Sequence, residues 1–320
     1  MVQWRNSYEQ IHRYKFNEPL FIPIELYDDK VQYLSQPLFD ILCMAEKYIG
    51  ELEEEKASAL SAYLLANILQ LFKTLLELAC LSGKSNVEST TKDFIFGNVV
   101  KNEFITNLLV HENVSVRSKT LEFFGQVLHL KLELLRNRNV SNEEYAHAKK
   151  KKKTKKTLED KTHISVQNLK SLIDNLCELA KVDVREELLL LNNLTYIYEI
   201  CELDPSLSKL TDGEEKNEEN DYLSGRFVYK KARSFYIHEK FHINGETSRR
   251  TLFYKLVLNI LKRMNEQRQR RDGENQTFSK MSTEMKEIII KHLSKDRKQS
   301  FLEEIAVEIE KEIQDLDLAQ

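Results

Sequence analysis

The sequence is poor in the residues that punctuate β structure, with 8 Gly and 4 Pro among 320 residues. Tight β turns need Gly for positive φ and Pro or Gly for chain reversal, so this scarcity disfavours a turn-rich β fold. Apolar residues make up 41% of the chain and charged residues 31%, a balance typical of a globular protein rather than a disordered one. Leu, Lys and Glu, which favour helices, are abundant. We therefore predict an all-α protein.

Local motifs of several enzyme classes are missing as well. The chain contains no P-loop, no GxGxxG, no GxSxG and no HExxH pattern. These patterns cradle phosphates, bind dinucleotides, carry a nucleophilic Ser or hold zinc. ATPase, Rossmann dehydrogenase and serine hydrolase activities therefore have no support in the sequence.

Potential metal ligands are not clustered. The four cysteines are Cys43, Cys80, Cys177 and Cys201. None of them forms a CxxC pair and each lies in an apolar helical context, which is typical of buried free thiols in a reducing compartment. His238 and His242 have the i,i+4 spacing of helical metal ligands, but no third ligand accompanies them. We predict no metal site and no cofactor.

A long apolar stretch, residues 57–82, predicts a helix without Gly or Pro. Its polar residues fall mainly at Asn67, Gln70, Lys73, Thr74 and Glu77. At about 100° per residue these share one narrow stripe, while Leu, Ile, Phe and Ala cover the rest of the circumference. A helix that is apolar over most of its girth must be surrounded by other helices or by lipid. We expect a multi-helix bundle or an irregular helical array around this central helix.

A membrane span is the alternative for this stretch. Residues 58–81 are long enough to cross a bilayer. However, Lys73 and Glu77 lie within the stretch, where charges are costly in lipid. The N-terminal residues also lack the apolar core of a signal peptide. We therefore expect a cytoplasmic protein that does not enter the membrane.

Apolar periodicity and helix punctuation predict further helices along the chain. They cover residues 36–49, 101–110, Ser115 onward, 165–181, 183–203, 223–241, 247–271 and 279–320, with a bend in the last near 294–296. Ser115 is the predicted N-cap of its helix. Residues 101–135, a short helix, a turn and a longer amphipathic helix, resemble a single armadillo or HEAT unit. One such unit does not make a solenoid, because stacking needs several.

Two charged segments interrupt the predicted helices. Residues 149–156 are almost all Lys and predict an exposed loop, for which a solvated linker, a phosphate contact and a nuclear-targeting run are the alternatives. Residues 211–221 are acidic and turn-rich, without the carboxylate spacing of an EF-hand. We predict a helical domain at 1–210, with an extended N-terminal lead-in, and a C-terminal helical domain at 222–320.

One segment carries residue types suited to RNA cleavage. Arg233 and His238 are separated by four residues, and Ser234 follows the Arg directly. With the next predicted helix, this pattern resembles the signature of the HEPN superfamily of all-helical ribonucleases over residues 226–264, although that family usually has Asn or Asp after the Arg. The resemblance implies a dimeric, metal-independent enzyme. His238 is then the general base and Arg233 the phosphate ligand, while Tyr236 helps to position the substrate.

Two functions are compatible with these patterns, and we favour the first. In it, Phe235 and Ile237 help their helix to pack, and Arg233 and His238 are surface or cap residues. The protein is then a non-catalytic helical interaction protein, a subunit or adaptor that binds a protein partner or itself. In the second, it is a HEPN-type endoribonuclease of the defence or toxin type, which contacts RNA through the Lys-rich loop and the Arg233–His238 segment.

Overall fold

The computed structural model describes residues 54–81, 95–147, 164–178, 184–204, 206–207, 223–237, 246–269, 281–297 and 302–317. Within these ranges all regular structure is helical, which confirms the all-α prediction. The helices are α3 (Glu54–Leu81), η2 (Ile95–Val99), α5 (Glu103–Asn107), η3 (Leu108–Val110), α6 (Val114–His147), α7 (Val166–Glu178), α8 (Val184–Leu203), α9 (Gly225–Ile237), α10 (Glu246–Gln269), α11 (Thr283–Asp296) and α12 (Glu303–Asp317). None of them has both the length and the apolar content that a membrane span requires.

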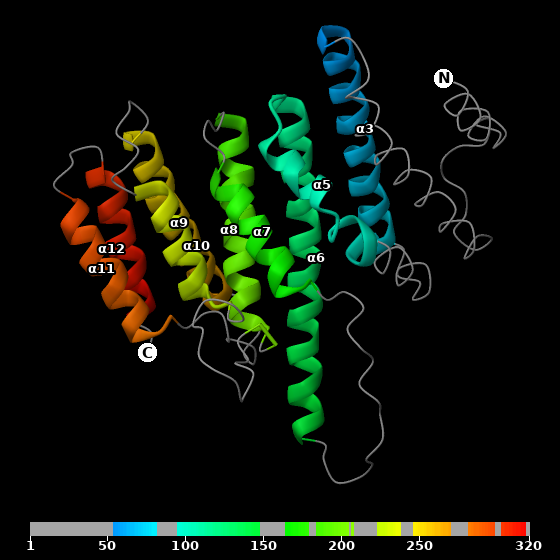
Figure 1. Ribbon diagram of the computed structural model, residues 1–320. Coiled ribbons are helices and arrows are strands. Elements are labelled where there is room, and N and C mark those ends of the chain that lie inside the picture. Colours follow the sequence, from blue (N-terminus) through cyan, green and yellow to red (C-terminus); the bar gives the residue numbers. More distant parts are fainter. Residues whose placement is uncertain are drawn as a thin grey trace, which may run out of the picture.

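The described helices form a row that is two layers deep (Figure 1). Layer A contains α3, α6, α8, α10 and α12, and layer B contains α5 with η3, α7, α9 and α11. Each layer-B helix directly precedes the layer-A helix on which it packs, so the chain builds the row as successive helix pairs. Figure 1 shows α3 at one end of the row, followed by these pairs in order to α11 and α12 at the other end.

Neighbouring helices of layer A run in the same direction. Near the start of α6 and α8, Arg117 Nε lies 3.0 Å from Glu186 Oε1. Further along both helices, Arg136 pairs with Glu199. The same order links α8 to α10 and α10 to α12 through the pairs Glu187–Lys255, Glu199–Arg263, Lys262–Glu308 and Asn265–Glu312.

Layer B is ordered in the same way but runs in the opposite direction. Residues later in one helix contact residues later in the next, so α7, α9 and α11 run in the same direction. α7 contacts α9 through Lys170–Phe227 and Asp174–Lys231, and α9 contacts α11 through Arg226–Glu284, Tyr229–His292 and Arg233–Asp296. The backbone N–H of Gly225, at the start of α9, donates to Glu202 near the end of α8 at 2.9 Å, so α9 runs back along α8. Antiparallel pairs that stack with like helices side by side are the arrangement of α-helical hairpin arrays.

Buried apolar side chains fill the space between the two layers. In α8, Leu190, Leu194 and Ile197 are fully buried and recur at the spacing of one helix face. Burying an aliphatic side chain of this size stabilises the fold by roughly 1.5–3 kcal/mol. The apolar segment that forms α8 is therefore a core helix, as its composition indicates.

The helix predicted at 57–82 is α3, but its expected central position is not confirmed. Among the described residues α3 packs on α6 and lies at one end of the row (Figure 1). Leu65 and Leu69 are fully buried, whereas Tyr63 is 70% exposed and Leu71 is 41% exposed. α8, the third of the five layer-A helices, occupies the central position instead.

The polar stripe of α3 makes local contacts. Lys73 Nζ lies 3.7 Å from Glu77 one turn later and 3.4 Å from Glu122 of α6. The side chains of Asn67 and Thr74 donate to backbone carbonyl oxygens of α3 itself. The stripe is therefore a helix surface with one cross-helix ion pair, and α9 lies elsewhere in the row (Figure 1).

Polar side chains set the ends of two helices. Asn113 caps α6, because its Oδ1 accepts from the backbone N–H of Ser115 at 2.9 Å and of Val116 at 3.3 Å. The prediction that Ser115 is the N-cap is therefore wrong by two residues. The bend predicted near 294–296 is the end of α11 at Asp296, and α12 is a separate helix.

The C-terminal end of α12 receives donors from α10. Arg268 Nη1 donates to the carbonyl oxygens of Asp315 at 3.2 Å and Leu316 at 3.0 Å. Asn265 Nδ2 donates to the carbonyl oxygen of Glu312 at 3.0 Å. Carbonyl groups in the last turn of a helix lack partners within the helix, and α10 supplies them here.

Two glycines lie at close helix contacts with different room around them. At Gly225 an added Cβ would lie 2.5 Å from Glu202 Oε1 and 2.6 Å from Cζ of Tyr198. At Gly125 of α6 an added Cβ would lie 3.5 Å from Nδ2 of Asn193, which is ordinary van der Waals contact. Only Gly225 therefore lies at a position where a side chain would not fit.

Several predicted features lie outside the described residues. They are the N-terminal lead-in, the helix at 36–49, the Lys-rich loop at 149–156, the acidic loop at 211–221, Cys43, His238 and His242. The cluster of buried apolar side chains has members on both sides of the acidic loop, such as Leu194 and Leu261. The division into domains at 1–210 and 222–320 stays a prediction.

Candidate functional site

Arg233, a predicted catalytic residue, lies on α9 at the contact with α11. Its Nη1 is 3.4 Å from Asp296 Oδ2, and its guanidinium carbon is 6.0 Å from the centre of the Phe253 ring. The side chain of Arg233 is 19% exposed and that of Asp296 is 8% exposed. Phe235 and Ile237 are partly buried against the core, as the packing interpretation expects. The guanidinium of Arg233 therefore contacts the Asp296 carboxylate and the Phe253 ring of neighbouring helices.

Tyr236, the predicted positioning residue, is buried. Its hydroxyl lies 3.5 Å from the carbonyl oxygen of Leu176 on α7. Burial, followed by the neighbouring Cys177, raises the pKa of Tyr236 well above its ordinary value. His238 lies outside the described residues, so the catalytic role of the Arg233–His238 pair stays a prediction.

A polar cluster surrounds Asp296 where α9, α10 and α11 meet. The Tyr254 hydroxyl donates to Asp296 Oδ2 at 2.5 Å, and the Tyr229 hydroxyl lies 3.0 Å from Nδ1 of His292. Burial and the hydrogen bond with Asp296 raise the pKa of Tyr254. Burial, reinforced by the charge of Arg233, lowers the pKa of His292. Near pH 7 the tyrosines are thus protonated and His292 is neutral, which suits structural hydrogen bonding.

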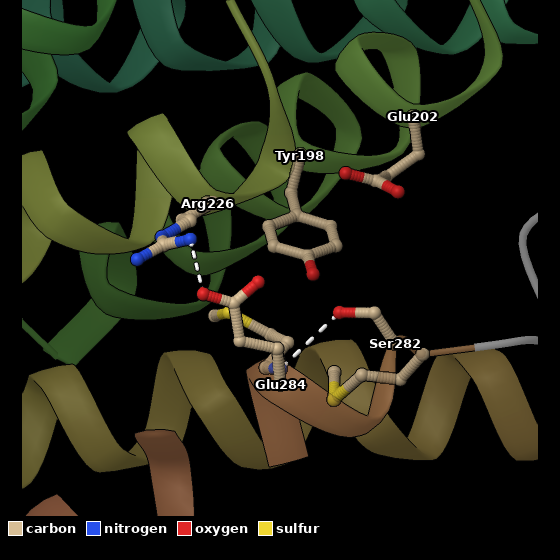
Figure 2. Close-up of a pocket in the computed structure, with 7 residues that line it drawn as sticks. Tyr198, Glu202, Arg226, Ser282 and Glu284 are labelled. Atoms are coloured by element: carbon tan, nitrogen blue, oxygen red, sulfur yellow. Dashed lines mark hydrogen bonds and ion pairs between the residues drawn. The ribbon is translucent and has the colours of Figure 1, made fainter. Parts of the chain in front are cut away.

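A small cavity lies between the end of α8, the start of α9 and the start of α11. It has a volume of about 50 Å³ and is lined by Tyr198, Glu202, Arg226, Met281, Ser282, Glu284 and Met285. Figure 2 shows Tyr198 pointing toward the start of α11, where Arg226 pairs with Glu284 at 2.5 Å. Burial, followed by the charge of Glu202, raises the pKa of Tyr198. The space suits ordered water, since drug-sized ligands and cofactors need about 300 Å³ or more.

Metal and thiol chemistry gain no support from the described residues. Among them, no group of three or more His, Cys, Asp and Glu side chains could hold a metal ion. Cys177 and Cys201 are free and buried. Burial raises the pKa of both thiols, so they remain protonated and are poor nucleophiles.

The outer side of layer B gathers cations around α9, which has four basic residues and no carboxylate. Phe227 is half-buried, and its ring centre lies 5.9 Å from Nζ of Lys170 and 5.7 Å from Nζ of Lys231. Lys231 also lies 3.7 Å from Asp174 of α7, and Lys230 is exposed. The result is a positively charged surface with an aromatic ring at its centre.

Two features of the structure are not predicted from the sequence. The first is this cation-rich side of α9, although the absence of Asp and Glu between 225 and 237 is a visible signal of it. The second is the fully buried carboxylate of Glu199, which pairs with Arg136 and accepts from Arg263 and Gln267, each at 2.8 Å. The sequence gives no specific signal for it, because α8 also carries Glu186, Glu187 and Glu202 and nothing local distinguishes Glu199 from them. A buried carboxylate needs cations from its neighbours, and here they come from distant helices.

Comparisons of the chain with models of protein families, with curated proteins and with solved structures found no match. The resemblances to HEPN ribonucleases and to an armadillo or HEAT unit therefore stay predictions. A function for the chain rests on the contacts and surfaces described above.

Proposed function

We propose that this protein is a helical interaction protein that acts as a subunit or adaptor. The observation that carries the proposal is the stacking of helix pairs in two parallel layers, which gives each layer a continuous outer side along the row (Figure 1). Stacked helix pairs of the α-solenoid type use such extended surfaces to bind other macromolecules. In this proposal the armadillo or HEAT character expected for residues 101–135 extends to the later pairs.

The contacts between pairs support a rigid surface. Glu186 and Glu199 are fully buried carboxylates of α8, and both are held by arginines from neighbouring layer-A helices. Separating two helices joined by such a pair would leave a buried carboxylate without its cation, which is strongly destabilising. A surface that is already ordered loses less conformational entropy on binding, so its contacts translate into affinity more directly.

The ribonuclease alternative is not part of this proposal. Arg233 is paired with Asp296, and a guanidinium held by a carboxylate has less positive charge to offer a phosphate. Near pH 7 the cluster around it is arranged for hydrogen bonding between α9, α10 and α11. No contact among the described residues favours cleavage over packing for this segment.

Partner recovery from the native cells tests the proposed function. The full chain, carrying an affinity tag, is cross-linked in the cells, purified under denaturing conditions and analysed by mass spectrometry. An unrelated tagged protein of similar net charge is the control. We expect at least one protein, or the chain itself, to be enriched and cross-linked to a described helix. A monomeric mass in solution together with no enriched protein would contradict the proposal.

A further inference from the structure

The outer side of layer B forms a continuous charged surface, which we call the basic face. It is defined by Lys170 on α7, by Phe227, Lys230 and Lys231 on α9, and by Lys291 and Lys295 on α11. The three helices contribute net charges of −1 from α7, +4 from α9 and 0 from α11, and therefore +3 together. α9 contacts both other helices, so the positive charge is concentrated at the middle of the face.

Helical periodicity directs the α9 side chains outward. Phe227, Lys230 and Ser234 recur at i, i+3 and i+7, which places them on one side of the helix. Val228 and Ala232 are fully buried and lie on the side that packs into the row. Lys230 and Ser234 are exposed, so this side of α9 faces solvent.

The lysines of α11 extend the face to the next pair. Lys291 and Lys295 follow Glu284 by seven and eleven residues, so all three share one side of α11. Glu284 lies 2.5 Å from Arg226, which places that side of α11 next to α9. Lys291 and Lys295 are exposed, and neither forms an ion pair with a described residue.

The carboxylates on this face are held loosely. The Lys231–Asp174 pair spans 3.7 Å with both side chains 41% exposed, and the side chains of Arg226 and Glu284 are 47% and 64% exposed. Ion pairs between groups this exposed contribute little to folding. The cations can therefore exchange these partners for the carboxylates of another molecule without unfolding the row.

The composition of the face favours a peptide over a nucleic acid. Interfaces with nucleic acids are much more positively charged than protein interfaces, because each phosphate needs neutralising. Here Asp174 and Glu284 lie among the lysines, so the face lacks the uninterrupted row of cations that a regularly spaced phosphate backbone requires. Phe227 and Ile288 add half-buried apolar surface, and mixed apolar and polar contact is usual between proteins.

We propose that the basic face binds an acidic, partly apolar segment of a partner protein. Carboxylates of the segment pair with Lys230, Lys231 and Lys291, and an apolar side chain packs on the accessible part of Phe227. The proposal rests on the interaction function proposed above and adds the chemistry of the partner to it.

Titration of the full chain with a fluorescein-labelled peptide of alternating Glu and Leu tests the assignment by anisotropy. The double variant Lys230→Glu/Lys291→Glu reverses two exposed charges of the basic face. Its matched control, Lys262→Glu/Lys311→Glu, makes the same change of net charge on exposed positions of layer A. We expect the first variant to bind about tenfold more weakly or worse and the control to change affinity less than about twofold. Added salt is expected to weaken binding to the wild type.

Three results would overturn the assignment. They are no binding of the peptide to the wild type, equal loss in both double variants, or tighter binding of an oligouridylate than of the peptide with loss in the basic-face variant alone. Circular dichroism confirms that both variants are folded. In the cross-linking experiment, a partner retained by the basic-face variant refutes this face but not the interaction function, whereas no partner for the wild type refutes the function itself.

Discussion

The two layers of the row are held together by different kinds of contact. In layer A, the side chains of Glu186 and Glu199 are fully buried. Arg117 of the adjacent helix pairs with Glu186, and arginines from both adjacent helices pair with Glu199. In layer B, the pairs Lys231–Asp174 and Arg226–Glu284 lie at the surface with 41% or more of each side chain exposed. These two carboxylates of layer A are thus directed into the row, whereas these two pairs of layer B face water. Exposed pairs such as Lys262–Glu308 occur in layer A as well.

This difference determines how much each of these ion pairs contributes to folding. Removing one partner of a buried pair strands a charge and is strongly destabilising, whereas exposed pairs contribute about 0–1 kcal/mol. The balance of charge differs too. In layer A, α3, α6, α8, α10 and α12 carry −1, +1, −3, +4 and −6, a total of −5, against a total of +2 for α5, α7, α9 and α11 of layer B. The fully buried carboxylates of these pairs lie in layer A, and the exposed pairs of layer B contribute little to folding.

The largest effect is expected at Glu199 of layer A. The variant Glu199→Ala leaves Arg136 and Arg263 without their shared carboxylate, and we expect the free energy of unfolding to fall by about 3 kcal/mol. Urea denaturation followed by circular dichroism measures it. The control is Glu133→Gln, which removes an exposed partner of the same Arg136 and should cost less than about 1 kcal/mol. Similar losses in both variants would remove the distinction between buried and exposed pairs.

An intermediate effect is expected where the layers meet, at Gly225. The variant Gly225→Ala places a methyl group against Tyr198 and Glu202, and we expect a loss of about 2 kcal/mol in thermal or urea unfolding. Gly125→Ala is the matched control, because its methyl group meets Asn193 at an ordinary distance and replaces Gly in a helix interior. It should be neutral or stabilising by up to about 1 kcal/mol. Equal destabilisation by both would mean that the two contacts are equally tight.

The smallest effect is expected for the exposed layer-B pair. The variant Arg226→Ala removes the contact with Glu284, and we expect a loss below about 0.5 kcal/mol that disappears at high salt. Urea denaturation at low and high salt measures both the size and the salt dependence. A loss above about 2 kcal/mol would show that layer B, too, depends on its ion pairs.

Much of the helix content is predictable because it depends on local patterns. Periodicity and punctuation predict α7, α8 and α10 to within a few residues at each end. The packing partners of a helix are not predictable in the same way. An apolar face shows that a helix side is buried, but it does not show which other helix covers that side. The stretch at 57–82 is apolar enough to be a core helix, yet α3 has one fully buried side and Tyr63 exposed on the other. α8 has polar residues at both ends and in its middle, yet it lies at the centre of the row.

The contacts of the candidate site are even less predictable from the sequence than the packing partners of the helices. The pairs that organise the row join residues far apart in the sequence, such as Glu199 with Arg136 and Arg263, 63 and 64 positions away. No spacing rule links such residues, so the sequence does not show that Glu199 is buried or which cations approach it. Arg233 stood out through its local spacing to His238, and its contact with Asp296 depends on the packing of α11 on α9.

The donors that α10 supplies to α12 have a consequence for local opening. Terminal turns of helices ordinarily fray first, and their amide hydrogens exchange with solvent at rates near those of the unfolded chain. The carbonyl oxygens of Asp315 and Leu316 are bonded to Arg268, which lies in the last turn of α10. We therefore expect the last turns of the two helices to open together, so that amide hydrogens at the end of α12 exchange slowly as long as α10 remains folded.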